Sequence, residues 1–279
     1  MGTDAPPPAG DGPPAGAAPS ATRTSMPPAV AWRGLHKRFG TTVAVDDVTL
    51  DIPRGSFFGV VGPNGAGKTT TMRMATGLLR PDGGHAEVGG LAVWPDPVPV
   101  KARIGVLPED LNLFERLTGE ELVTYHGLLR RMPEAVVAAR TAELLSVLGL
   151  ADAATTMVVD YSHGMRKKVA LAAALLHAPP VLFLDEPFEA LDPVSARTIR
   201  AVLDAHVAKG GTIVFSSHVM ALVESLCDRV AIVHAGHVVA AGRLDDVRRG
   251  RTLEEAFLDS VGATGTSFGG LGWLGSSSA

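Results

Sequence analysis

The hydrophobic pattern along the chain predicts an α/β fold. Short runs that are almost wholly apolar are typical of strands buried on both faces. Such runs occupy residues 57–61, 104–107 and 181–184, and a turn followed by a strand covers residues 210–217. Between them, apolar residues recur at helical spacing, which predicts helices at residues 68–79, 167–177, 194–208 and 221–228.

Other segments alternate apolar and polar positions, which indicates antiparallel strands with one exposed face. They are residues 30–33, 42–45 and 48–52, a hairpin arm at 86–93, and a hairpin at 230–239. Gly40 marks the turn after the first of these strands, and residues 95–99 are expected to form a loop. The chain therefore combines a buried sheet with a second, antiparallel part.

Residues 111–150 differ from their surroundings because their apolar positions follow helical spacing throughout. Thr118 and Glu121 fit a capping box, Pro133 begins a second helix, and Gly149 ends it. We expect a helical insertion at about residues 111–165 within a domain that spans residues 29–261. The exposed side of this insertion is a candidate docking surface.

The two ends of the chain are poor in groups that could form a core. Residues 1–28 are mostly Pro, Ala, Gly and Ser, and residues from 262 onward are rich in Gly and Ser. Such segments bury too little apolar surface to offset their ordering entropy. We expect a disordered arm at 1–28, which lacks the features of a signal peptide, and a flexible tail at 262–279.

Composition and charge narrow the range of possible functions and partners. The net charge is −4 and no basic tract of five residues occurs, which argues against nucleic acid as the main partner. The single cysteine, Cys227, cannot form an internal disulfide and lies in an apolar stretch, so packing in a core is favoured over a nucleophilic role. No apolar run is long enough to span a bilayer, so any action at a membrane is expected to need a partner.

The strongest motif lies between the strand at 57–61 and the helix at 68–79. It fits the phosphate-binding pattern G-x-x-x-x-G-K-[ST] without a mismatch. Its residues are Gly62, Pro63, Asn64, Gly65, Ala66, Gly67, Lys68, Thr69 and Thr70. Glycines let backbone N–H groups turn inward toward a phosphate, and the helix N-terminus adds unpaired donors. Lys68 supplies a charge for the β- and γ-phosphates, and the Thr69 hydroxyl suits Mg²⁺. The alternative is a glycine-rich turn that contains Lys-Thr by chance.

Two acids, Asp185 and Glu186, directly follow the buried strand at 181–184. One carboxylate at such a strand end can hold a phosphate-bound Mg²⁺, and the other can orient or deprotonate a water for attack on the γ-phosphate. An Asp-Glu pair after a strand is common and is weak evidence by itself. It becomes strong evidence for a nucleotide site because a phosphate loop lies upstream in the chain.

Five further candidate residues each have a structural alternative to the functional role. Phe39 fits a purine-stacking role and a core role equally well. Glu109, which follows the strand at 104–107, could meet Mg²⁺ or water, but a solvated acidic turn is favoured. Ser162 and Gly164 begin a helix that could face an anion, although an ordinary capped helix is favoured. His218 follows the strand at 210–217; a lone His is usually structural, but this one is expected at the edge of the sheet that carries the phosphate site.

Taken in order, these motifs resemble the ATP-binding subunit of an ABC transporter over about residues 30–258. The resemblance implies a P-loop NTPase core with a mixed sheet, an antiparallel β subdomain and a helical insertion. It assigns each candidate a role, as follows: Phe39 stacks on adenine, Asp185 binds Mg²⁺, Glu186 is the catalytic base, His218 contacts the γ-phosphate, Asp192 acts across a dimer interface, and Ser162 and Gly164 match the signature motif that closes over the ATP of the opposite subunit.

Two departures resemble the ABC-2 type export branch. The usual signature Leu-Ser-Gly-Gly-Gln is replaced by residues 161–165, in which His163 adds bulk and Met165 lacks an amide. The usual Gln after the strand at 104–107 is Glu109, which can still bind Mg²⁺. The ending at residues 253–257 is also similar to that branch. These features favour export over import.

The resemblance implies a homodimer that sandwiches two ATP molecules and drives a separate multi-span permease from the cytoplasmic face of the cell membrane. A soluble ABC ATPase of translation or DNA repair is an alternative, but such proteins usually carry two cassettes or a long coiled-coil insertion, and neither occurs in this sequence. A scaffold without turnover is a third possibility. The presence of Lys68, Asp185, Glu186 and His218 argues against it.

Overall fold

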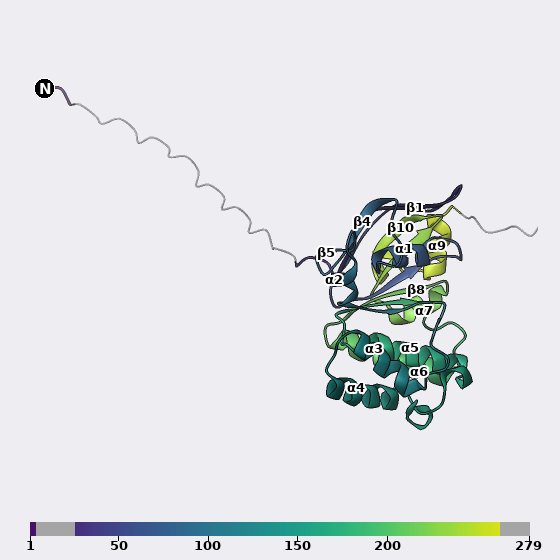
Figure 1. The fold of residues 1–279 in the computed structure, drawn as a ribbon. Helices are drawn as coiled ribbons and strands as arrows, with labels where there is room; N and C mark the ends of the chain where they lie inside the picture. The colour runs from purple at the N-terminus through teal and green to yellow at the C-terminus, as the bar shows by residue number, and fades with distance from the viewer. Residues whose placement is uncertain (4–25, 263–279) are drawn as a thin grey trace, which may run out of the picture.

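A computed structural model describes residues 1–3 and 26–262 (Figure 1). The strands are β1 (Val30–Phe39), β2 (Thr42–Ile52), β3 (Phe57–Val61), β4 (Gly83–Val88), β5 (Leu91–Ala92), β6 (Ile104–Leu107), β7 (Val181–Asp185), β8 (Thr212–Ser217), β9 (Arg229–His234) and β10 (His237–Arg243). The α-helices are α1 (Lys68–Ala75), α2 (Val98–Lys101), α3 (Gly119–Leu129), α4 (Glu134–Val147), α5 (His163–Leu175), α6 (Pro193–Ala208), α7 (Met220–Leu226), α8 (Leu244–Arg248) and α9 (Leu253–Ser260). Two 3₁₀ turns, η1 (Ala151–Ala153) and η2 (Val158–Asp160), connect α4 to α5.

The central sheet has six strands in the order β10-β9-β3-β8-β7-β6. All neighbouring pairs are parallel except β9 and β10, so the sheet is mixed, as predicted. Every residue of β3 and of β7 is buried, because both faces of these strands are covered. Because β3, β7 and β8 run parallel, their carboxyl ends share one edge of the sheet.

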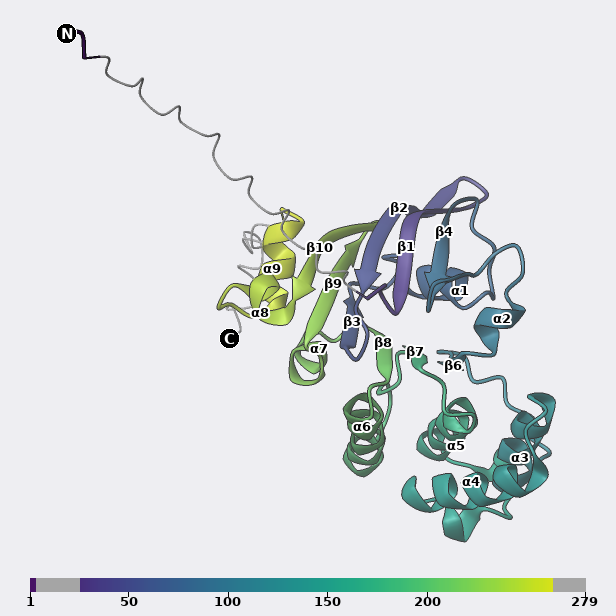
Figure 2. The ribbon, with the colours of Figure 1, turned by 90° about the vertical axis from the view of Figure 1, so that its left-hand side faces the viewer.

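A second sheet of four antiparallel strands, in the order β2-β1-β4-β5, lies on one side of the first (Figure 2). Helix α1 contacts β1, β2 and β4 of this sheet and β7 of the central sheet. The apolar side chains of α1 join one core with those of both sheets. Its members include Trp32, Val48, Phe58, Met72 and Phe183, each less than 5 % exposed. The antiparallel sheet thus fixes α1 against the central sheet.

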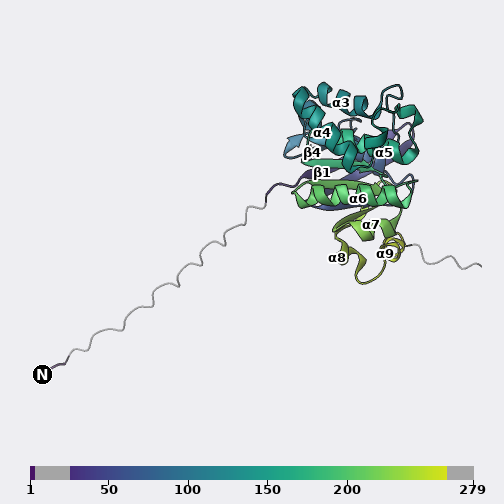
Figure 3. The same cartoon turned by 90° about the horizontal axis from the view of Figure 1, so that it is seen from below.

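Helices α3, α4, α5 and α6 gather on the opposite side of the central sheet (Figures 1 and 3). Their apolar faces form a second core with that sheet, to which Leu122, Leu148, Leu171 and Phe215 belong. The predicted capping box is confirmed, because the Glu121 amide donates to the Thr118 hydroxyl at 3.2 Å and the Thr118 amide donates to the Glu121 carboxylate at 2.9 Å. Residues 163–165 belong to α5, which packs directly on β6.

Four local predictions were wrong. Residues 42–45 and 48–52 form one strand with a bulge near Asp47, whose φ is 51°. The helix predicted to reach residue 79 ends at Ala75, since Gly77 has a φ of 70° and the amides of residues 78 and 79 return to the Arg73 carbonyl. Residues 95–99 include the start of α2, and no helix covers residues 111–118. The expectations for residues 4–25 and 263–279 lie outside the described residues.

Gly105 in β6 offers a test of the packing between α5 and the sheet. A Cβ at this position would lie 2.3 Å from the carbonyl oxygen of Ala174 and 2.6 Å from Cδ2 of Leu182. We expect Gly105→Ala to lower the free energy of unfolding by about 1–3 kcal/mol, measured by urea denaturation. Gly242→Ala in β10 is the control, because a Cβ there meets only Cγ2 of Val247 at 3.6 Å. Equal stability of the two variants would contradict this packing.

Candidate active site

The phosphate loop between β3 and α1 needs its glycines for two separate reasons. Gly65 and Gly67 have φ angles of 79° and 105°, in a region that side chains disfavour. A Cβ on Gly62 would lie 2.0 Å from the Val233 carbonyl oxygen, and one on Gly67 would lie 2.5 Å from the Ala44 carbonyl oxygen. The first amides of α1 have no partner within the helix and are available to a phosphate.

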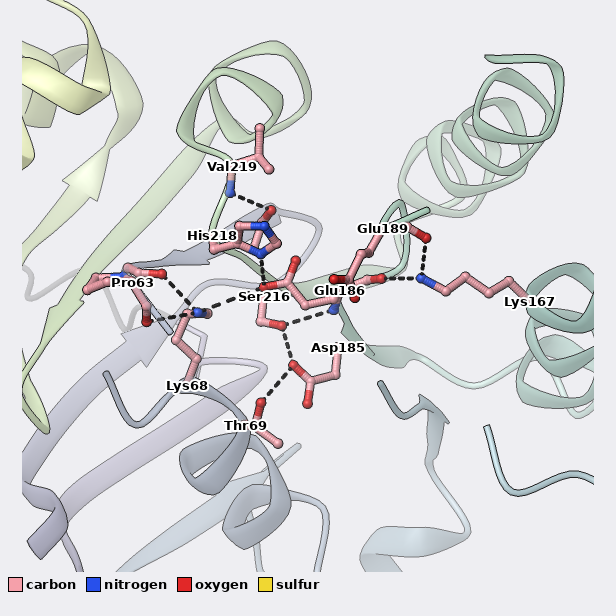
Figure 4. A network of polar contacts seen from close by, with 12 residues as sticks. Pro63, Lys68, Thr69, Lys167, Asp185, Glu186, Glu189, Ser216, His218 and Val219 are labelled. Atoms are coloured by element: carbon pink, nitrogen blue, oxygen red, sulfur yellow. Dashed lines mark hydrogen bonds and ion pairs between the residues drawn. The ribbon is translucent and has the colours of Figure 1, made fainter. Parts of the chain in front are cut away.

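Lys68 is the first residue of α1 and is 6 % exposed. Its ammonium donates to the carbonyl oxygens of Gly62 at 2.8 Å and Pro63 at 3.2 Å, and lies 3.8 Å from Oε1 of Glu186 (Figure 4). Burial lowers the pKa of Lys68, while the carboxylates of Glu186 and Asp185 act in the opposite direction. The phosphate loop therefore holds the buried ammonium of Lys68 against its own carbonyl oxygens.

Asp185 is the last residue of β7, and its carboxylate accepts hydrogen bonds from Thr69, just after the phosphate loop glycines, and from Ser216 of β8. The Thr69 hydroxyl donates to Oδ1 of Asp185 at 3.3 Å, and the Ser216 hydroxyl donates to the same oxygen. The amide of Glu186 in turn donates to Oγ of Ser216 at 3.1 Å. The sequence reasoning missed this role of Ser216, since a serine in a strand carries no signal for it; only the pairing of Asp185 with Ser216 across the sheet brings them together.

Glu186 is 6 % exposed and follows β7 with a left-handed φ of 46°. Its Oε1 lies 3.0 Å from Nδ1 of His218 (Figure 4). This contact brings the predicted base together with the histidine predicted to contact the γ-phosphate, as expected from their positions after neighbouring parallel strands. The structure thus places Lys68, Glu186 and His218 in one connected group.

A cavity of about 310 Å³ opens beside this group. Its lining consists of Phe39, Ala44, Asn64, Gly65, Ala66, Gly67, Lys68, Thr69, Thr70, Glu109 and Glu186. Phe39 is 50 % exposed at the end of β1, so the alternative that it belongs to the core is wrong. Ala44 was not predicted, because its contribution depends on the approach of β2 to Gly67. Gly62, Pro63, Asp185 and His218 join the site through their hydrogen bonds to its lining residues.

Ser162, Gly164 and Asp192 do not line this cavity and form a separate group. Ser162 caps α5 by accepting from the Met165 amide at 3.3 Å. Asp192 caps α6, and hydrogen bonds from Ser195 lower its pKa. A Cβ on Gly164 would lie 3.4 Å from the Asp192 carboxylate, so the two helix starts pack closely. Within one chain Ser162 and Asp192 act as helix caps, and Gly164 lies in the first turn of α5.

The oxygen groups near the loop fit Mg²⁺ better than a soft metal. Thr69 and Asp185 already lie within 3.3 Å of each other, and Glu109 lines the same cavity. Among the described residues, no group of three or more His, Cys, Asp and Glu side chains could hold a metal ion. Mg²⁺ commonly uses one or two protein oxygens and completes its shell with phosphate and water. The site therefore fits a metal that arrives with a nucleotide.

Comparison with known proteins identifies the family of this chain. The sequence model of the family described as "ABC transporter" matches residues 45–189, which is more than half of the chain. A daunorubicin/doxorubicin resistance ATP-binding protein of Streptomyces peucetius is 39 % identical over 220 residues, covering 79 % of this chain and 67 % of that protein. The chain belongs to the ABC transporter family. This membership makes it an ATPase of the ABC type.

Two further similarities support the assignment. A fluoroquinolones export ATP-binding protein of Mycobacterium tuberculosis is 39 % identical to this ABC ATPase over 238 residues, covering 84 % of this chain and 77 % of that protein. A dimeric ATP-binding cassette solved in a post-hydrolysis state with ADP and Pi matches with a TM-score of 0.71 at 25 % identity, covering 77 % of this chain and 98 % of that one. Within the described residues of the ABC ATPase, none of the helices has the length and apolar character that crossing a bilayer requires.

Glu109 provides a test of the electrostatics of the site. Burial raises the pKa of Glu109 above its ordinary value of 4.5, and the carboxylates of Asp185 and Glu189 add to the rise. Because the pKa is higher in the folded state, ionisation of Glu109 destabilises the fold above that pKa, and the cost disappears as the pH falls below the unfolded value.

We expect Glu109→Gln to raise Tm by about 1 °C at about pH 7.5 without nucleotide or Mg²⁺, since solvent screens this exposed group. The difference should vanish below about pH 4, where both states are protonated. Glu143→Gln, on the exposed side of α4, is the control and should leave Tm unchanged at about pH 7.5. A less stable Glu109→Gln protein at about pH 7.5 would contradict the proposed repulsion.

Proposed function

We propose that this chain is the ATP-hydrolysing subunit of an exporter whose membrane-spanning part is a separate ABC-2 type permease. The observation that carries the proposal is the contact of one Glu186 oxygen with both His218, at 3.0 Å, and Lys68, at 3.8 Å, beside the phosphate loop. The relatives from Streptomyces and Mycobacterium are named for drug resistance and drug export, and this supports export as the direction of transport.

ATP would enter the cavity with its triphosphate on the loop. Lys68 would leave its contacts with the Gly62 and Pro63 carbonyls and neutralise charge on the β- and γ-phosphates. Phe39, half exposed at the cavity, would stack on the adenine. Mg²⁺, held by Thr69, Asp185 and Glu109 directly or through water, would offset the negative charge that develops during phosphoryl transfer.

Glu186 would act as the general base. Its carboxylate is nine-tenths buried, lies next to the cavity and is oriented by His218, so it can accept a proton from a water aligned with the γ-phosphate. His218 would contact the γ-phosphate with the rest of its ring, which is about one-third exposed. Thr70, Asn64 and the glycines would complete the phosphate contacts through their backbone.

A second copy of the chain would complete the site. Ser162, Gly164 and Asp192 lie away from the cavity of their own chain, at the starts of α5 and α6. A face-to-face homodimer would bring the α5 start of one copy over the ATP of the other, and removal of the γ-phosphate would let it open. The permease would dock on the exposed side of residues 111–165, at the cytoplasmic face of the membrane.

Replacement of the proposed base is the direct test. We expect Glu186→Gln to leave equilibrium ATP binding near that of the unchanged protein and to lower kcat by about 100-fold or more, because the amide cannot accept the proton. Phosphate release and binding of a fluorescent nucleotide are the measurements. Glu143→Gln, which changes an exposed carboxylate on α4, is the control and should keep its turnover. Normal hydrolysis by Glu186→Gln would remove Glu186 from this role.

Replacement of Phe39 tests whether its ring stacks on adenine. Phe39→Ala should weaken ATP binding by roughly tenfold, since loss of one aromatic stack costs about 1–3 kcal/mol. Phe39→Trp should keep the affinity because the larger ring offers the same face. The kcat at saturating ATP should change little in either variant, as the phosphate groups are untouched. Equal affinities of the Ala variant and the unchanged protein would show that Phe39 does not contact the base.

A further inference from the structure

A buried lysine on α5 contacts the loop that carries the proposed base. Lys167 is 2 % exposed, and its Nζ donates to the carbonyl oxygens of Glu186 and Glu189, each at 2.7 Å (Figure 4). We call residues 186–192, between β7 and α6, the catalytic loop. Burial lowers the pKa of Lys167, and the carboxylates of Glu189 and Glu186 oppose this effect. A charged side chain is costly to bury unless its partners are well placed, and these two short hydrogen bonds provide them.

The catalytic loop has a backbone that needs support. Glu186 and Ala190 have φ angles of 46° and 54°, both in the left-handed region that residues other than glycine disfavour. The Glu186 carbonyl accepts from the Glu189 amide at 3.2 Å and from Lys167. The ammonium of Lys167 therefore bridges the carbonyl oxygens of Glu186 and Glu189. These two hydrogen bonds favour the strained backbone conformation over an extended one.

The backbone and the carboxylate of Glu186 are held by residues from other elements. Its amide is held by Ser216 of β8, and its carboxylate by His218 just after β8. Its carbonyl is held by Lys167 of α5. Without Lys167, the Glu186 carbonyl keeps only the Glu189 amide at 3.2 Å, so the peptide that follows Glu186 rotates more freely and the carboxylate moves with it. Shifts of about 1 Å at a catalytic group are enough to cost a large part of the rate.

We propose that Lys167 is a positioning residue that holds the backbone of Glu186 in the conformation needed for hydrolysis. This inference rests on the proposed role of Glu186 as the base. Lys167 lies five residues after Ser162, which caps the same helix.

The test replaces the ammonium and keeps the length of the side chain. We expect Lys167→Met to lower kcat by about tenfold or more, because two charge-assisted hydrogen bonds are lost, while KM and the affinity for ATP change by less than about twofold. Lys168→Met is the matched control: Lys168 is the next residue of α5, is 8 % exposed, and makes no hydrogen bond to the catalytic loop in the described part of the chain. An unchanged kcat in Lys167→Met overturns the proposal.

A second variant separates positioning from loss of stability. Lys167→Gln keeps an N–H donor in a smaller side chain, so we expect a kcat between those of the Met variant and the unchanged protein. A Gln variant that is folded by circular dichroism but no faster than the Met variant overturns the proposal. Where the Met variant does not fold, Lys167→Gln is compared with the unchanged protein, and a reduced kcat at constant KM supports the proposal while an unchanged kcat overturns it.

Glu186→Gln distinguishes failure of this inference from failure of the proposed function. Normal hydrolysis by Glu186→Gln removes the base and the positioning role together. An inactive Glu186→Gln beside a fully active Lys167→Met overturns only the role of Lys167. In the double variant, loss of Lys167 should add little to the loss caused by Glu186→Gln, since both act on the same step; a full additional tenfold loss contradicts the link between them.

Discussion

The parallel register of β3, β8 and β7 is the constraint on which the site depends. Val61 pairs with Ser217, and Ser216 pairs with Asp185, so the segments after these strands leave the sheet at one edge. The phosphate loop, the catalytic loop and His218 all follow directly from these strand ends. A slip of one residue in the register would turn Asp185 to the other face of the sheet and break its contact with Thr69.

Buried charge shapes the site as strongly as the sheet does. Lys68, Lys167, Asp185 and Glu186 are each at most 6 % exposed. Each has partners within hydrogen-bond distance, because an unpaired charge at this depth would cost several kcal/mol. The result is a set of groups already oriented before the substrate binds, and such preorganisation is how a protein stabilises charge that develops in a transition state.

The antiparallel sheet and the β9–β10 turn support the phosphate loop from the other side. The Gly236 amide donates to the Ala66 carbonyl at 3.0 Å, and the Asp46 amide donates to the Gly236 carbonyl at 2.9 Å. Together with the close approach of Ala44 to Gly67, these bonds hold the loop between the two sheets. Phe39 ends β1 of the antiparallel sheet. The sheet that supports the phosphate loop therefore also carries the ring that is proposed to stack on adenine.

The sequence alone determined the buried strands, the phosphate loop, the Asp185–Glu186 pair and the capped helices, because local spacing and glycine chemistry encode them within a few residues. Taken singly, Phe39 was left open between purine stacking and the core. The sequence pattern missed one helix end and the bulge in β2, because Gly77 and Asp47 act through positive φ angles that composition does not reveal. It also wrongly predicted a loop over the start of α2 and a helix over residues 111–118. Ser216, Ala44 and Lys167 became visible only in the tertiary structure. Their roles depend on contacts with residues about 20 to 30 positions away in the chain, which only the packing of the sheets and of α5 creates.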